Sequence, residues 1–426
     1  MWWAHHHGGV ELLPCGHLAA AGDRLVCRHL TRDVEIEHVR LFTGRGVDYN
    51  LCCVGCERSG GELIVACEGC VARIEEDGDC LGFRGTPEIR HRLSPVIAHL
   101  RGMRLPRAPL DLAPIPSRPY AWLLLTGHRL IEWRSDTGAI AGQGTLISLP
   151  MVVGNGYFAD LPVRPRLYVS PSGRYCGIVN DFDQLGVVVD RQTGRLVATL
   201  DRGRYYPGTT RFPFAFIDHP DGERFVHATS WNRLDVSDAR SGALLTTREL
   251  GKRRLDYFHG ALQVSPDGRW IADDGWVWHP VGYPLVWDLH AWQRNPFEPE
   301  DGPSRRRIAD RPDWNQPVCW IGGHLVLSGI GDSNDNHLMP GARIFDPRTG
   351  HEIATFAGPT GDLFSAAGRL LAAAANGLEI WDVTTGELTG QVPGFVPQWQ
   401  HPATRELVAL DGDRATVWKP DGSPHA

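Results

Sequence analysis

The sequence predicts a mainly β protein in which a small cysteine-rich module precedes a closed ring of small antiparallel sheets. Three observations support this fold class. A unit of short strands and tight turns recurs over the last three quarters of the chain. Eight of the ten cysteines lie within the first 80 residues. The chain has 49 glycines and 31 prolines, a combined share well above the usual figure of about 12%, which favours turns over long helices.

Length and composition indicate a globular chain with more than one unit or one large repeat array. The chain has 426 residues, nearly three times a typical domain of about 150. With 42% hydrophobic and 22% charged residues, it can bury a sizeable core. No apolar run reaches the roughly 18 residues that span a bilayer, and the first residues lack the pattern of a secretory signal. We therefore expect a cytoplasmic monomer with no membrane partner.

The charge balance makes nucleic acid an unlikely partner for the surface as a whole. The formal net charge is -7, whereas phosphate binding depends on accumulated lysine and arginine. Among the 43 basic residues only Lys252 and Lys419 are lysine, which we interpret as the amino-acid usage of a GC-rich bacterial genome.

The sharpest motif of the first module, residues 1–82, is a pair of C-x2-C knuckles. Cys53 and Cys56 form the first, and Cys67 and Cys70 form the second after ten intervening residues. Cytosolic thiols stay reduced, so such a cluster indicates metal rather than disulfides. The tight turn of each knuckle lets two thiolates approach one ion, and two knuckles complete a tetrahedral zinc site. A redox dithiol and a set of inert cysteines are the alternatives, and Cys52 competes with Cys53 as ligand.

A second group of potential metal ligands consists of two C-x-H pairs. Cys15 and His17 form one, and Cys27 and His29 form the other. Residues i and i+2 of a strand share a face, so each pair can offer both side chains to a second zinc. Ordinary buried thiols and surface imidazoles are the alternative, and Cys52 or Cys80 could replace one ligand. Four protein ligands leave no open position, so either zinc would be structural. The two-knuckle segment resembles zinc ribbons over about 20 residues.

Residues 83–118 are predicted to form a linker rich in arginine and proline. Five prolines between Pro106 and Pro119 make this stretch extended and stiff. The last repeat unit stops soon after its third strand, which leaves an open sheet edge. Residues 87–93 or 96–105 could supply the closing strand; a ring closed within residues 119–426 is the alternative.

Seven units recur in residues 119–426, at an average of about 44 residues, which suits four-stranded propeller blades. Each contains an apolar strand, which in every unit except that of Leu285–Asp288 is followed by a glycine turn. The strand ends are Leu130–Arg134, Val187–Asp190, Leu234–Asp238, Leu285–Asp288, Ala342–Asp346, Leu378–Asp382 and Ala415–Lys419.

These motifs resemble WD-repeat and quinoprotein-like β-propellers over about 300 residues. The Trp-Asp pair itself occurs at Trp287-Asp288 and Trp381-Asp382. The family's Gly-His pair is scattered, so its buried hydrogen-bond tetrad is not expected in each blade. The predicted fold is therefore a seven-bladed β-propeller preceded by a small zinc-binding module.

No catalytic motif was found: G-x-S-x-G and the phosphate-binding G-x4-G-K-[ST] are both missing from the sequence. Residues 332–336 begin like a calcium loop, but His337 stands where glycine is needed, so we expect a polar loop. Two insertions, residues 290–312 and 329–341, lengthen the ring. Five tryptophans lie in or near turns and insertions, where they would form a peptide-binding face if exposed and core if buried. They are Trp231, Trp276, Trp278, Trp292 and Trp314.

The resulting functional prediction is a non-enzymatic platform for a protein partner, with zinc as a structural cofactor and no catalytic residues. The alternative is a propeller enzyme, quinoprotein-like or lyase-like, with its site at the mouth of the central channel. A weaker third possibility is nucleic-acid binding by the zinc module and the arginines of residues 84–118.

Overall fold

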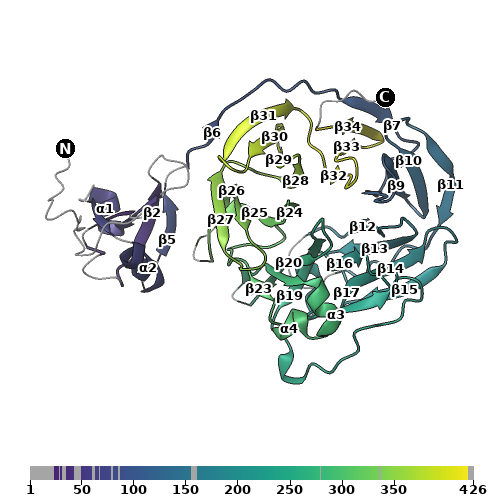
Figure 1. Ribbon diagram of the computed structural model, residues 1–426, viewed down its shortest axis with the longest axis horizontal. Helices are drawn as coiled ribbons and strands as arrows, with labels where there is room; N and C mark the ends of the chain where they lie inside the picture. Colours follow the sequence, from purple (N-terminus) through teal and green to yellow (C-terminus); the bar gives the residue numbers. More distant parts are fainter. Residues whose placement is uncertain are drawn as a thin grey trace.

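The computed structural model describes residues 24–27, 29–30, 35–42, 49–59, 63–66, 68–77, 80–84, 87–154, 161–278, 280–333, 335 and 337–420. Within them the chain consists mainly of short β-strands, with few and short helices. Figure 1 shows a small N-terminal module beside a ring of small sheets. No helix of this described part is long and apolar enough to cross a membrane.

The N-terminal module is one five-stranded sheet in the order β4-β1-β3-β2-β5. Its strands are β1 (Arg24–Cys27), β2 (His38–Phe42), β3 (Tyr49–Cys53), β4 (Leu63–Ala66) and β5 (Cys80–Arg84). Helix α1 (Val54–Ser59) follows β3 directly, and α2 (Glu68–Asp77) follows β4. Val26, Val39, Leu51 and Ile74 belong to a small core of twelve buried residues among those described, four of them cysteines. A core of this size stabilises a module only weakly.

The ring consists of small antiparallel sheets in which consecutive strands pair, the arrangement of a β-propeller. The first sheet contains β8 (Asp111–Pro114), β9 (Ala121–Thr126), β10 (Arg129–Arg134) and β11 (Ile140–Leu146). The second contains β12 (Arg164–Val169), β13 (Tyr175–Asp181), β14 (Leu185–Asp190) and β15 (Leu196–Asp201). The third contains β16 (Phe214–Ile217), β17 (Arg224–Ser230) and β18 (Arg233–Asp238).

The fourth sheet contains β19 (Phe258–Val264), β20 (Trp270–Val277), β21 (Val281–Gly282), β22 (Leu285–Asp288) and β23 (Arg306–Arg307). The fifth contains β24 (Val318–Ile321), β25 (His324–Ile330), β26 (Met339–Phe345) and β27 (Glu352–Ala357). The sixth contains β28 (Asp362–Ala366), β29 (Arg369–Ala374), β30 (Gly377–Asp382) and β31 (Glu387–Pro393). The last contains β32 (Trp399–Gln400), β33 (Leu407–Asp411) and β34 (Arg414–Trp418).

The segment between module and ring supplies strands to the ring. Strand β6 (Arg90–His91) pairs with β31, and β7 (Arg101–Arg104) pairs antiparallel with β34 as the outer strand of the last sheet. Strand β8 also comes from the segment that the sequence assigned to a linker. Glu406 of the last sheet accepts hydrogen bonds from Trp122 Nε1 (2.7 Å) and the Ser135 hydroxyl of the first sheet. The first and last sheets are thus joined, and β7 covers the edge of β34 that would otherwise be open.

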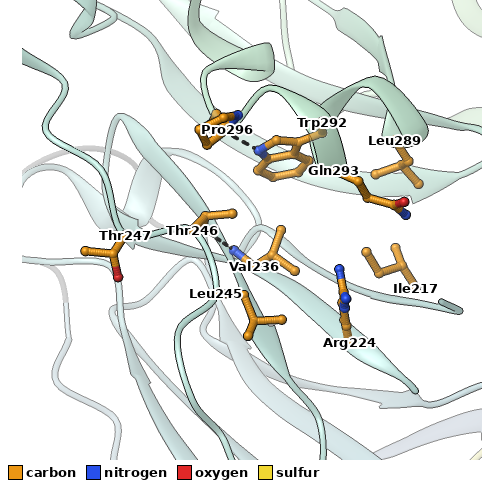
Figure 2. Close-up of a pocket in the computed structure, with 10 residues that line it drawn as sticks. All are labelled: Ile217, Arg224, Val236, Leu245, Thr246, Thr247, Leu289, Trp292, Gln293 and Pro296. Atoms are coloured by element: carbon orange, nitrogen blue, oxygen red, sulfur yellow. Dashed lines mark hydrogen bonds between the residues drawn. The ribbon is translucent and has the colours of Figure 1, made fainter. Parts of the chain in front are cut away.

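The third sheet has three strands, and residues 243–246 hydrogen-bond to its outer strand β18. An insertion from the fourth sheet packs against it. Helices α3 (Leu289–Arg294) and α4 (Glu298–Asp301) lie between β22 and β23. Leu289 and Trp292 of α3 share a core with Ile217 and Val236 of the third sheet. Figure 2 shows these side chains around a pocket of about 290 Å³ between α3 and the sheet.

A buried ion-pair network holds this insertion in place. The Arg248 guanidinium, 2% exposed, contacts Asp235 Oδ1 of β18 at 2.5 Å and Glu300 of α4. It also donates to the Leu234 carbonyl at 2.9 Å. Arg248 therefore bridges the third sheet and the insertion.

Replacing Arg248 with methionine should destabilise the protein by about 3–5 kcal/mol, because Glu300 loses its buried counter-ion and Asp235 keeps only the partly exposed Arg233. Urea denaturation gives this free energy. The matched control is Arg253→Met. It breaks the exposed ion pair between Arg253 and Asp301, which lies on the same α4 helix as Glu300 (side chains 50% and 52% exposed). Exposed pairs contribute at most about 1 kcal/mol. Equal losses in both variants would contradict the role of Arg248.

Candidate metal centre and interaction face

Four potential metal ligands of the N-terminal module converge. The ligand atoms of Cys27, His29, Cys53 and Cys56 all lie within 4.8 Å of one another. Strands β1 and β3 are parallel neighbours, with Val26 opposite Leu51, so their C-terminal ends lie at one edge of the sheet. Cys27 and Cys53 are the last residues of these two strands. His29 follows the first strand, and α1 places Cys56 beside the second.

The spacing of these atoms suits a tetrahedral ion. His29 Nδ1 lies 3.1 Å from Cys56 Sγ and 3.7 Å from Cys53 Sγ. In a tetrahedral zinc site, bond lengths of about 2.0–2.3 Å place ligand atoms roughly 3.3–3.8 Å apart, close to both of these separations. The backbone N–H of Cys53 also donates to Cys27 Sγ at 3.2 Å, a contact that stabilises a thiolate ligand. Three thiols and one imidazole form a donor set that zinc prefers.

Burial and crowding disfavour free thiolates in this cluster. Burial, followed by the neighbouring Cys53 and Cys27, raises the pKa of Cys56 to about 11. Burial and the same neighbours raise the pKa of Cys52 to about 12. Since the thiolate is the metal ligand, a bound divalent cation would supply the positive charge that this cluster lacks.

The structure combines one ligand pair from each of the two sites predicted from sequence. Cys53 and Cys56 belong to the predicted first site, and Cys27 and His29 to the predicted second. Cys67, Cys15 and His17 lie outside the described residues, so the two predicted ligand sets stay predictions. Cys70 lies in α2, half-buried, and is not among the four converging residues.

The module contacts the ring through Arg40 of β2, whose side chain is 8% exposed. Its Nη1 lies 2.7 Å from Asp332 Oδ2 and 3.7 Å from Asp335 Oδ2, in the insertion between β25 and β26. Its Nε lies 3.2 Å from Glu75 Oε1 of α2, and Tyr49 donates to the same oxygen at 2.6 Å. The loop that begins like a calcium site therefore faces a guanidinium. The sequence offers no local signal for this contact.

Strand direction places several features on one face of the ring. In a meander of four antiparallel strands, the start of the first and third strands and the end of the second and fourth lie at one edge. We call this edge of the ring face A. The insertion that Arg40 contacts follows the second strand of its sheet, β25, and therefore lies on face A.

The axial cavity of the ring opens on face A. Its volume is about 670 Å³, and it is lined mainly by residues at or just before the start of the innermost strands. Every sheet of the ring contributes. The contributors include Asp111, Arg166, Arg211, Gln263, Val318, Asp362 and Trp399.

A continuous aromatic cluster lies on face A between the third and fourth sheets. The cluster consists of seven aromatic side chains, those of Tyr205, Tyr206, Trp231, Phe258, Trp276, Trp278 and Trp314. Trp314 stacks on Trp276 with centroids 4.7 Å apart, and Trp276 stacks on Phe258 at 4.3 Å. Tyr205 continues the stack and is 45% exposed. The cluster contains four of the five tryptophans singled out in the sequence. The fifth, Trp292 of α3, is buried in the core between the third and fourth sheets.

A buried arginine fixes the loop that carries the two tyrosines. Arg202, 2% exposed, donates to the carbonyls of Asp183 and Thr210, both at 2.9 Å. Burial lowers the pKa of Arg202 to about 9. From the fourth-to-fifth sheet connection, Trp314 Nε1 donates to the Thr209 carbonyl at 2.7 Å. These hydrogen bonds anchor the loop that carries Tyr205 and Tyr206 to the neighbouring sheets.

Comparisons with known proteins support the fold alone. No protein-family model matches the sequence, and no curated protein matches it. Among solved structures, a chain of "Kuenenia stuttgartiensis Hydrazine Synthase" matches with a TM-score of 0.50 and 16% identity, over 75% of this chain and 97% of that chain. A chain of "Crystal Structure of Mitotic Checkpoint Complex" matches with a TM-score of 0.47 and 12% identity, over 79% and 95%. The molecule is thus a β-propeller with a cysteine and histidine cluster in its N-terminal module.

Proposed function

We propose that this protein is a non-enzymatic, cytoplasmic platform that binds a protein partner through face A of a seven-bladed, WD-repeat-like propeller. Each sheet of the ring is one blade, and β7 completes the last. The observation that carries the proposal is the aromatic cluster, whose outermost ring, Tyr205, is 45% exposed. Tyrosine and tryptophan are enriched among the residues that dominate protein–protein binding energy.

Two observations favour a protein partner. Stacked rings held by Arg202 and Trp314 offer a large apolar surface at little cost in conformational entropy. The N-terminal module contacts the same face of the ring through Asp332, so a partner on face A can contact both parts of the chain. The net charge of -7 disfavours nucleic acid as that partner.

We further propose that zinc is the metal of the module, held by Cys27, His29, Cys53 and Cys56, and that its role is structural. With all four positions filled by protein, no site remains for a reacting water. The metal would stabilise a sheet whose own core is small.

The test is isolation of the tagged full-length protein from the cells that naturally produce it, followed by mass spectrometry. A partner in near-stoichiometric amount should accompany the wild type. The double variant Tyr205→Ala, Trp231→Ala should retain at most about one thirtieth of it, since truncating such anchors costs 2 kcal/mol or more. The matched control is Leu196→Ala, an exposed apolar residue (51% exposed) at the start of β15 and so away from face A. Equal recovery with both variants, or no stoichiometric partner, would contradict the proposal.

A further inference from the structure

We infer that the axial cavity is a binding site for a small organic anion, recognised by the guanidinium groups of Arg164, Arg166 and Arg211. This goes beyond the proposed platform role, which uses the aromatic surface of face A. A volume of about 670 Å³ lies within the range of about 300–1,000 Å³ that small-molecule sites occupy.

The amide side chains that line the cavity are committed to the fold. Gln263 Nε2 donates to the Val318 carbonyl at 2.9 Å. Asn315 donates to the Thr209 carbonyl at 2.8 Å and accepts the Arg211 backbone N–H at 3.1 Å. Gln398 likewise accepts from the Leu410 backbone and donates to the Val396 carbonyl. Recognition of a ligand therefore falls mainly to the charged groups.

Two buried carboxylates position Arg166 at the wall of the cavity. Asp111, 4% exposed, accepts the Leu167 backbone N–H at 2.7 Å and Trp399 Nε1 at 3.2 Å. Asp181, also 4% exposed, accepts the Phe212 backbone N–H at 3.0 Å. Each carboxylate is thus fixed by groups from another sheet or another strand.

Arg166 is held by charge and keeps its hydrogen-bond donors free. Its Nη1 lies 3.8 Å from Asp111 Oδ1, and its Nε lies 3.6 Å from Asp181 Oδ2. Both distances exceed a hydrogen bond, and no hydrogen bond joins this guanidinium to any other described residue. The side chain is 38% exposed, so the N–H donors of Nη2, which face neither Asp111 nor Asp181, remain available to a molecule in the cavity.

Two further guanidiniums line the same space. Within the described part of the chain, neither the Arg164 side chain nor the Arg211 side chain forms an ion pair or a hydrogen bond. Arginine forks match the geometry of carboxylate and phosphate oxygens. Asp111 and Asp181 already offset the charge of Arg166, so the anionic ligand is favoured by Arg164 and Arg211, which form no ion pair with any described carboxylate. Exposed Asp362 adds an acceptor for a hydroxyl group, which favours a hydroxylated anion.

The test is titration calorimetry of the full-length protein at constant ionic strength, with citrate, glucose 6-phosphate and glucose as probes. We expect saturable binding of at least one of the two anions and none of glucose. Citrate and glucose 6-phosphate distinguish a carboxylate ligand from a phosphorylated one. Binding of neither anion, or equal binding of glucose, would overturn the inference.

Variants locate the binding in the cavity. Arg164→Gln and Arg211→Gln each remove a guanidinium without leaving a buried carboxylate unpaired, and each should weaken anion binding about tenfold. Arg166→Met should abolish it, although this variant also unpairs Asp111 and Asp181. The matched control is Arg348→Gln, whose side chain is 71% exposed and pairs with Asp346 in the turn after the third strand of its sheet, away from face A. Anion binding that is unchanged in Arg164→Gln and Arg211→Gln would place the ion elsewhere and overturn the inference.

Discussion

Cys56→Ser should unfold the N-terminal module and leave the propeller folded. The four-ligand cluster joins β1, β3 and α1, and a structural zinc contributes on the order of 10 kcal/mol to the folded form of a small domain. The core around Val26 and Leu51 is too small to replace that contribution. Differential scanning calorimetry should show the loss of one transition, and elemental analysis should show the loss of one zinc per chain.

A second pair of variants distinguishes the ligand set of the structure from the two-knuckle set. If Cys27, His29, Cys53 and Cys56 hold the ion, His29→Ala should lose the zinc and Cys70→Ser should keep it. The two-knuckle set predicts the reverse. An unchanged thermal transition and zinc content in Cys56→Ser would contradict both sets.

Arg40→Met should release the module from face A. The substitution removes the buried cation that Asp332 of the ring and Glu75 of the module share. We expect a loss of about 3 kcal/mol, at the lower end of the range for a broken buried pair because Asp332 is 35% exposed. Small-angle X-ray scattering should report an increased radius of gyration, since residues 84–90 then tether two independent bodies.

Charge exchange and a surface control make this result specific. The double variant Arg40→Asp, Asp332→Arg should recover part of the compactness lost in Arg40→Asp alone. Arg58→Met, which changes an exposed arginine of α1 in the same module, should scatter like the wild type. If Arg40→Met keeps the wild-type radius of gyration, this ion pair does not hold the module on the ring.

Local patterns in the sequence predicted the small-sheet fold because each sheet of the ring is built from neighbours in sequence. Strands such as Leu378–Asp382 alternate with glycine turns, so a residue and its hairpin partner lie within one repeat. The C-x-H and C-x2-C pairs were also recognisable, since the two members of each pair are only two or three positions apart in the sequence. Their combination into one cluster was not, because it depends on β1 and β3 being parallel neighbours.

The remaining features depend on contacts between distant segments. Arg40 and Asp332 belong to different parts of the chain, and nothing in the residues around either one indicates the other. Asp111, Arg166 and Asp181 each look like an ordinary polar residue near the end of a strand. Only closure of the ring brings them to one cavity, so their shared role follows from the structure alone.

The pairing of β7 with β34 also means that the last sheet can be completed only late in the synthesis of the chain. Arg104 and its partner Asp413 are 309 positions apart. The ribosome therefore releases β7 long before it releases β34. Contacts between such remote segments form slowly, and unpaired strand edges invite association with other chains. A nascent copy therefore carries an unpaired β7 edge while the 309 residues up to Asp413 are synthesised, and a chain truncated before β34 would keep that edge unpaired.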